Sequence, residues 1–167
     1  FDVTTDNGVE EVVLSYDLLH VAPPMSPPDF VKNSKLAVAD GPSKGWVDVN
    51  KETLQHNIYP NVFSLGDASS LPTSKTAAAI RRQAPLLIQN LLAQMAAQPN
   101  SGHYDGYTCC PLITGYGKTI MAEFDYSMTP RSSFPMDPTK ERYSMWLAKK
   151  KLIPWLYWNR MVKGIPF

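Results

Sequence analysis

A Gly-Asp pair, a polar turn and an alanine-rich segment form the stretch of sequence best suited to bind a ligand. Gly66-Asp67 ends a short apolar run at residues 62–65, which predicts a buried strand followed by a tight turn. Glycine allows a close backbone approach, and Asp67 supplies an acceptor at the strand end. A helix beginning after Lys75-Thr76 would direct its first amides at an anion or a carbonyl-rich ring. An aspartate that only caps this helix is the alternative.

The two cysteines of the chain, Cys109 and Cys110, are adjacent. A thiolate is a nucleophile that can hold a persulfide and pass electrons to a neighbouring acceptor. Adjacent cysteines can also form a strained vicinal disulfide or remain unreacted thiols, and a single pair does not suggest a secreted disulfide framework. The histidines, at positions 20, 56 and 103, show no ligand spacing, so we expect no metal site.

The composition is that of a folded domain. The chain has 167 residues, of which 44% are hydrophobic and 19% charged, enough for a core and unlike a disordered segment. A formal net charge of +1 gives no indication of nucleic-acid binding. Fifteen prolines predict long ordered loops. Because the sequence begins at Phe1 rather than at a methionine, we expect it to be a fragment.

Hydrophobic periodicity predicts an α/β fold. We expect strands at residues 1–5, 11–14, 16–21, 45–49 and 61–65, and a second hairpin with strands at 107–114 and 118–126. A long helix at 76–98 carries an apolar stripe and is expected to kink at residues 81–84, in the turn before Pro85. A final helix from about residue 140 is expected to break at Pro154.

The C-terminal segment combines aromatic and basic residues. Trp146, Trp155, Tyr157 and Trp158 are interleaved with the lysines at 149–151, which is typical of a helix at a membrane interface. No run approaches the roughly 20 apolar residues of a spanning helix. A core helix rich in aromatic residues is the alternative.

Seven segments, taken in order, resemble the C-terminal part of the sulfide:quinone oxidoreductase family, in its mitochondrial-like branch. They are HVAPPMSPP at 20–28, GWVDV at 45–49, LPTSKTAAA at 71–79, YDGY at 104–107, CPLITGY at 110–116, AEFDY at 122–126 and LYWN at 156–159.

This resemblance implies a domain organisation and a cofactor. Residues 1–100 would be the C-terminal part of a FAD/NAD(P)-type dinucleotide-binding domain, and residues 101–167 a redox-cysteine hairpin followed by a membrane-facing helical tail. FAD would be held largely by a further N-terminal half. Here it would contact Gly66, Asp67, Lys75 and Thr76. Because Lys75 opposes the helix dipole, it needs an anionic partner such as a reduced flavin, a quinone oxygen or Asp67.

The resemblance also implies an activity for the parent protein. Cys110 would be the catalytic cysteine, with a partner cysteine from the other half. Sulfide would be oxidised through a cysteine persulfide, and electrons would pass through FAD to a membrane quinone. Phe124 and Tyr126 are candidates for the quinone pocket, or else core aromatics of a strand. The parent would be peripheral to the bacterial or mitochondrial inner membrane, and a homo-oligomer is compatible with this.

Two other functions stay open on the sequence. A type-two NADH:quinone dehydrogenase shares the architecture and does not need Cys110. A non-catalytic scaffold or interface domain would need neither the cysteine nor the flavin contacts.

Overall fold

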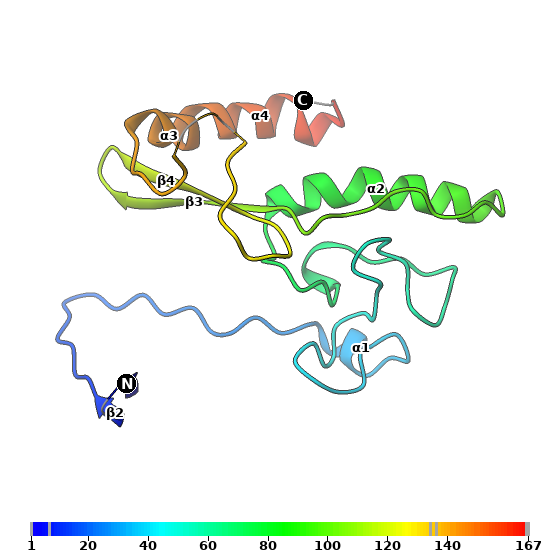
Figure 1. Ribbon diagram of the computed structural model, residues 1–167, viewed down its shortest axis with the longest axis horizontal. Coiled ribbons are helices and arrows are strands. Elements are labelled where there is room, and N and C mark those ends of the chain that lie inside the picture. Colours follow the sequence, from blue (N-terminus) through cyan, green and yellow to red (C-terminus); the bar gives the residue numbers. More distant parts are fainter. Residues whose placement is uncertain (1, 7, 134, 136, 166–167) are drawn as a thin grey trace.

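The computed structural model describes residues 2–6, 8–133, 135 and 137–165 (Figure 1). It contains both helices and strands, in agreement with the α/β class. The strands of the described residues form two separate antiparallel pairs. A dinucleotide-binding domain, which needs a larger parallel sheet, is not shown.

An N-terminal hairpin and an extended segment precede the main body of the chain (Figure 1). Strand β1 (Asp2–Thr5) pairs with β2 (Gly8–Glu11), so the hairpin is confirmed but its return strand begins earlier than predicted. The strand predicted at 16–21 is wrong. That segment has no regular structure, and no strand among the described residues runs beside it to accept its hydrogen bonds.

The region from α1 (Asp29–Lys32) to residue 76 consists mainly of loops, which are joined by isolated β-bridges. The strands predicted at 45–49 and 61–65 are wrong. Val47 forms isolated bridges with Ala37 and Ser69, and Phe63 bridges only to Gln55. A single bridge cannot extend into a ladder where neighbouring backbone groups bond elsewhere, as the amide of residue 49 does to the Ser70 hydroxyl at 3.2 Å.

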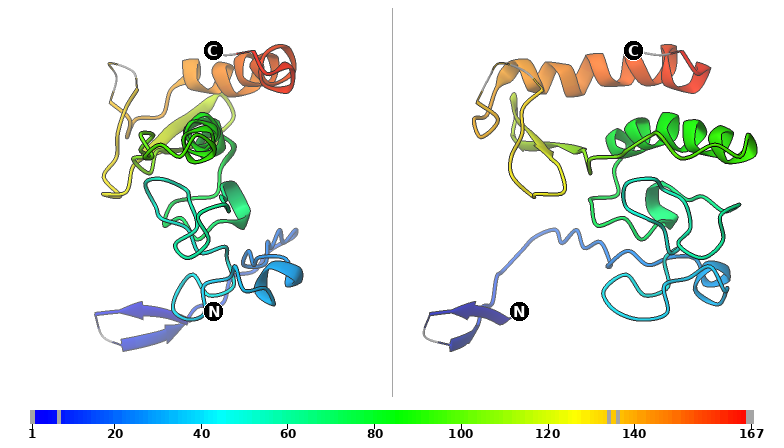
Figure 2. Two further views of the ribbon diagram at one scale, coloured as in Figure 1. Left: turned by 90° about the vertical axis from the view of Figure 1, so that its right-hand side faces the viewer. Right: turned by 45° about the vertical axis from the view of Figure 1, so that its right-hand side comes forward.

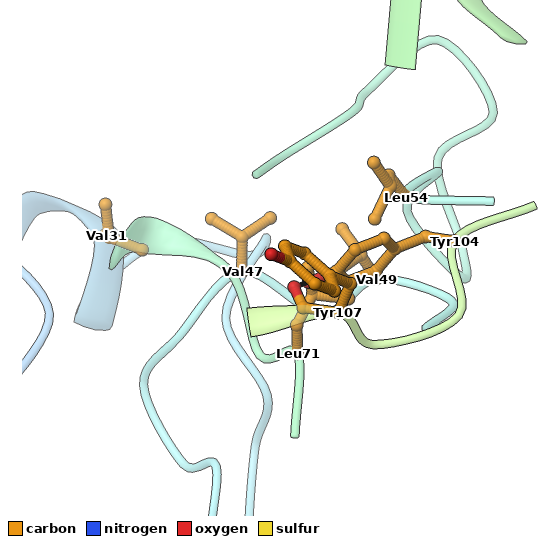
Figure 3. Packing of buried hydrophobic residues seen from close by; sticks show 7 residues of the cluster. All are labelled: Val31, Val47, Val49, Leu54, Leu71, Tyr104 and Tyr107. Atoms are coloured by element: carbon orange, nitrogen blue, oxygen red, sulfur yellow. Dashed lines mark hydrogen bonds between the residues drawn. The ribbon is translucent and has the colours of Figure 1, made fainter. Parts of the chain in front are cut away.

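The buried core lies among these loops rather than on a sheet. Seven residues form it: Val31, Val47, Val49, Leu54, Leu71, Tyr104 and Tyr107. Figure 3 shows the two tyrosines packed closely against Val49 and Leu71, with Val31 at one end of the cluster. The segment that leads into the second hairpin is thereby anchored to loops much earlier in the sequence.

Helix α2 (Ala77–Met95) begins after Thr76, whose hydroxyl accepts the Ala79 amide at 3.1 Å, and continues without interruption through Pro85. Its fully buried residues are Ala79, Gln83 and Asn90. The predicted apolar stripe is only half-buried or exposed, with Ile88 and Met95 exposed. Leu86 and Leu87 pack against the core, but two of the three most deeply buried side chains of this helix are polar.

Asn90 shows what these polar side chains do. Its side-chain Nδ2 donates to the carbonyl oxygens of Thr53 and Gly102, both at 2.9 Å. Its Oδ1 accepts the amides of Ser101 and Gly102, at 3.2 and 2.8 Å. One side chain thus satisfies four backbone groups in two loops.

The second hairpin and a helical rod complete the fold. Strand β3 (Thr108–Gly115) pairs with β4 (Lys118–Phe124), as predicted. Helices α3 (Tyr143–Leu147), η2 (Ala148–Leu152) and α4 (Ile153–Asn159) follow in line, and η3 (Met161–Lys163) ends the rod (Figures 1 and 2). The predicted break at Pro154 is wrong. The proline follows the π-helical turn η2 and lies in the first turn of α4. A backbone amide in the first turn of a helix has no hydrogen-bond partner within that helix, so proline is tolerated there.

Replacing Asn90 by leucine should destabilise the protein strongly. Four buried backbone groups would lose their partner, which we expect to lower the free energy of unfolding by about 3 kcal/mol or more. Urea unfolding would measure the loss. The control is Gln89→Leu, an exposed position one residue earlier, where we expect a change within about 0.5 kcal/mol. Equal effects of the two substitutions would contradict the role assigned to Asn90.

Candidate functional site

The Gly66-Asp67 turn is a short 3-10 helix, η1 (Gly66–Ala68), rather than the end of a strand. Gly66 has a φ of +62°, and a Cβ built there would lie 3.1 Å from the Ile80 side chain. A side chain would therefore be both strained and crowded. The Gly66 amide donates to Gln83 Oε1 at 2.8 Å. Backbone conformation and close helix packing together require glycine at this position.

Asp67 is exposed, and its backbone is held from one side. Its carbonyl oxygen accepts Trp46 Nε1 at 3.0 Å. The structure gives no helix-capping bond to its carboxylate, since Thr76 caps α2 instead. The alternative that Asp67 only caps the helix is therefore not supported, and the carboxylate is accessible to a ligand.

Lys75 already has partners within the chain. Its Nζ donates to the Ser69 carbonyl at 2.6 Å and lies 5.4 Å from the centre of the Trp46 ring. Burial lowers the pKa of Lys75, and the nearby Asp67 carboxylate partly opposes this. Of the anionic partners proposed from the sequence, Asp67 is the one present in the described residues.

The N-terminus of α2 has amides available for a ligand. Thr76 accepts the amides of Ala79 and Ile80 through its side chain and carbonyl respectively. The amides of Ala77 and Ala78 have no hydrogen-bond partner among the described residues. Such amides carry partial positive charge and suit an electron-rich carbonyl oxygen.

A pair of threonine hydroxyls joins the start of α2 to the strand that carries the cysteines. Thr76 Oγ1 lies 2.9 Å from Thr108 Oγ1, and Thr108 Oγ1 also donates to the Ser74 carbonyl at 3.2 Å. Residues two apart on a strand share a face and lie about 7 Å apart. Cys110 therefore shares a face of β3 with Thr108, the residue that contacts the N-terminus of α2.

Strand alternation makes the two cysteines unequal. Both are free thiols, Cys110 exposed and Cys109 half-buried on the opposite face. Burial, with the cross-strand neighbour Glu123 adding to it, raises the pKa of Cys109 to about 11. Neighbouring side chains in an extended strand point apart, which disfavours a disulfide between them.

Phe124 and Tyr126, proposed for a quinone pocket, have different surroundings. Phe124 is half-buried and pairs with Thr108 across the hairpin. The hydroxyl of Tyr126 donates to the carbonyl of Lys51 at 2.6 Å, and its ring meets Tyr104 edge-on at 5.7 Å. Tyr126 thus fastens the hairpin to the core.

A cleft of about 660 Å³ lies on the Cys109 side of the hairpin. Arg81, Tyr107, Glu123 and Arg131 are among its lining residues. Sequence reasoning did not predict this cleft. The sequence feature that could have indicated it is an acidic residue, Glu123, within a predicted strand. Glu123 is buried and accepts hydrogen bonds from the amide and hydroxyl of Ser133, at 2.8 and 2.7 Å.

The C-terminal rod exposes apolar and aromatic side chains beside basic ones. Trp155 is 54% and Trp158 65% exposed, so the alternative of a core helix is not supported within this chain. Lys149 is an exception among the basic residues, since its Nζ donates to the Pro111 carbonyl at 2.6 Å. No helix in the described part of the chain combines the length and apolar character needed to cross a membrane. The same residues contain no cluster of three or more potential metal ligands.

Comparison with known proteins identifies close relatives. Mitochondrial sulfide:quinone oxidoreductases match at 53% identity in Mus musculus, over 95% of this chain, and at 51% in Dictyostelium discoideum, over 90%. The Schizosaccharomyces pombe enzyme matches at 43% over 89%. The resemblance predicted from the motifs is confirmed. The chain spans about a third of the length of these sulfide:quinone oxidoreductases, with 33–34% of each covered.

Two further comparisons concern family and fold. No family model matches the chain. A chain in the cryo-EM structure of the Tetrahymena thermophila mitochondrial ATP synthase has a similar fold, with a TM-score of 0.69 and 25% identity. The similarity covers 79% of this chain and 31% of that one.

The two cysteines should differ sharply in reactivity. With a pKa of about 11, about one Cys109 thiol in a thousand is ionised at pH 8, and only the thiolate is alkylated. Iodoacetamide should therefore modify Cys109 in a Cys110→Ser variant about 100-fold more slowly than Cys110 in a Cys109→Ser variant. Mass spectrometry of the peptide over time measures both rates. Similar rates at pH 8 would contradict the burial assigned to Cys109.

Proposed function

We propose that this chain is the C-terminal part of a flavin-dependent sulfide:quinone oxidoreductase. The observation that carries the proposal is the 43–53% identity to mitochondrial enzymes of that name over 89–95% of the chain. The mitochondrial inner membrane is the corresponding location. The NADH dehydrogenase and scaffold alternatives have no comparable support.

The residues around the start of α2 fit a flavin. The exposed Asp67 carboxylate suits a ribityl hydroxyl, and the amides of Ala77 and Ala78 suit a pyrimidine carbonyl. When bound, FAD would accept two electrons and pass them to quinone. In this proposal Gly66 and Thr76 keep the turn and the helix N-terminus in position, and Lys75 adds a positive charge beside them. The phosphate end of the cofactor would be held by the rest of the parent protein.

Cys110 carries the sulfur chemistry in this proposal. It would share a disulfide or persulfide bridge with a cysteine from outside this chain. Hydrosulfide attacks one sulfur of the bridge. A bond forms between the sulfide sulfur and the attacked sulfur, the S–S bond of the bridge breaks, and the other cysteine leaves as a thiolate. The sulfide sulfur becomes sulfane sulfur, and its two electrons reside on the thiolate. Exposure of Cys110 and the strand face that it shares with Thr108, which contacts the α2 N-terminus, support this role.

Replacing Cys110 by serine in the full-length parent should abolish the activity. We expect sulfide-dependent quinone reduction to fall by at least about 100-fold, because serine cannot form the sulfur–sulfur bond. Absorbance of the quinone measures the rate, and Cys109→Ser, which we expect to keep most of it, is the matched control. Near-normal activity of the Cys110 variant, or oxidation of NADH but not sulfide by the wild type, would refute the proposal.

The exposed tail provides access to a quinone dissolved in the bilayer. Tryptophan and tyrosine favour the membrane interface, and lysines are attracted to anionic lipid. Phe124 would lie on the quinone path under this proposal, while the bond from Tyr126 to Lys51 argues for a mainly structural role.

Truncating the tail aromatics should weaken membrane binding. The double substitution Trp155→Ala and Trp158→Ala removes exposed apolar area, so we expect at least about tenfold weaker co-sedimentation of the parent with vesicles of phosphatidylcholine and cardiolipin. Activity with a water-soluble quinone should be preserved. The control Phe30→Ala removes an aromatic side chain that is 79% exposed, on α1. Unchanged vesicle binding of the tail variant would exclude this surface as the anchor.

A further inference from the structure

Gln83 lies between the two parts of the proposed site. It is 1% exposed and projects from the second turn of α2. Its Oε1 accepts the amide of Gly66 at 2.8 Å, which fixes the first residue of the η1 turn. Asp67 follows directly. The position of the Asp67 carboxylate therefore depends on a side chain from the helix.

The other end of the Gln83 amide faces the segment that leads to the cysteines. Tyr104 is 2% exposed, and its hydroxyl donates to the Tyr107 carbonyl. Burial raises the pKa of Tyr104, and hydrogen bonding from the Gln83 and Thr73 side chains partly lowers it again. Tyr107 immediately precedes β3, so it stands three residues before Cys110.

Two hydrogen bonds, at Gly66 and at Tyr107, flank the neighbouring side chains of Gln83 and Tyr104. The Gly66 amide donates to Gln83 Oε1, and the pKa effect of the Gln83 side chain on Tyr104 places its free amide nitrogen near the Tyr104 oxygen. Tyr104 in turn donates to the carbonyl of Tyr107. All four residues are buried. Such bonds strengthen one another in a low dielectric, and a missing member leaves buried partners unsatisfied.

We propose that Gln83 is a positioning residue, which sets the placement of the Gly66-Asp67 turn relative to the strand that bears Cys110. Thr76 and Thr108 link the N-terminus of α2 to that strand. Turn and strand are thereby held to the same helix, the turn through Gln83 and the strand through Thr108. This inference rests on the proposed function, in which the flavin contact and the redox cysteine must face one another.

The test uses the full-length parent with Gln83→Met, which keeps the length of the side chain but neither accepts nor donates as an amide does. The first readout is the long-wavelength absorbance band that a thiolate in contact with an oxidised flavin would give after sulfide is added. The second is hydrogen exchange of the peptide spanning residues 65–68. We expect the band to fall by more than half per bound flavin, and exchange in this peptide to accelerate about tenfold. Gln89→Met, on the exposed side of the same helix, is the matched control and should change neither.

Tyr104→Phe provides an independent test should the Gln83 variant fold poorly. It removes only the hydroxyl and should reduce the same band. Since either substitution interrupts this set of hydrogen bonds, the double variant should lose little more than Gln83→Met alone. A wild-type band in either single variant, even with faster exchange, would overturn the positioning role. A wild-type parent without flavin or without the band would instead overturn the proposed function.

Discussion

The buried amide of Gln83 bonded to the Gly66 backbone is the constraint on which the arrangement of the candidate site depends. The backbone of this region runs largely as loops, so its polar groups have no sheet ladder to satisfy them. Helix α2 supplies the missing partners from its buried face. Gln83 fixes the η1 turn, and Asn90 fixes the loops at residues 53 and 101–102. Because a buried amide without a partner costs more than an apolar contact gains, these positions define one conformation of the loops.

Different parts of the site are held with different strength. The turn at Gly66, the threonine pair and the Tyr104 hydroxyl are all buried or half-buried and hydrogen-bonded. Asp67 and Cys110, the two groups proposed to meet ligand and substrate, are exposed. Rigid neighbours therefore carry accessible reactive groups, as expected where a geometry must be kept without blocking access.

Sequence periodicity predicted the elements that depend on local pattern. Helix α2, the hairpin of β3 and β4 and the helical tail follow from spacing and turn residues. The strands expected at 45–49 and 61–65 failed because a short apolar run becomes a strand only beside a partner with a complementary ladder. The buried polar side chains of α2 were missed: Leu87 of the predicted stripe packs against the core, but Gln83 and Asn90 on the same face are the more deeply buried. Placing Cys110 near α2 needed the contact between Thr76 and Thr108, which no local pattern contains.

Two cysteines that are adjacent on a strand can differ strongly in burial and reactivity. Because side chains alternate along a strand, Cys109 lies beside its buried cross-strand neighbour Glu123, whereas Cys110 lies on the exposed side. Burial beside a carboxylate favours the neutral thiol, so the pKa of Cys109 rises and its nucleophilicity at neutral pH falls. Under the proposed function, a persulfide on Cys110 would thus have no reactive neighbour within its own strand that could attack it and close a vicinal disulfide. The same alternation that keeps Thr108 and Cys110 on one face isolates the second thiol, so the proposed sulfur transfer would need an acceptor that approaches from outside the strand.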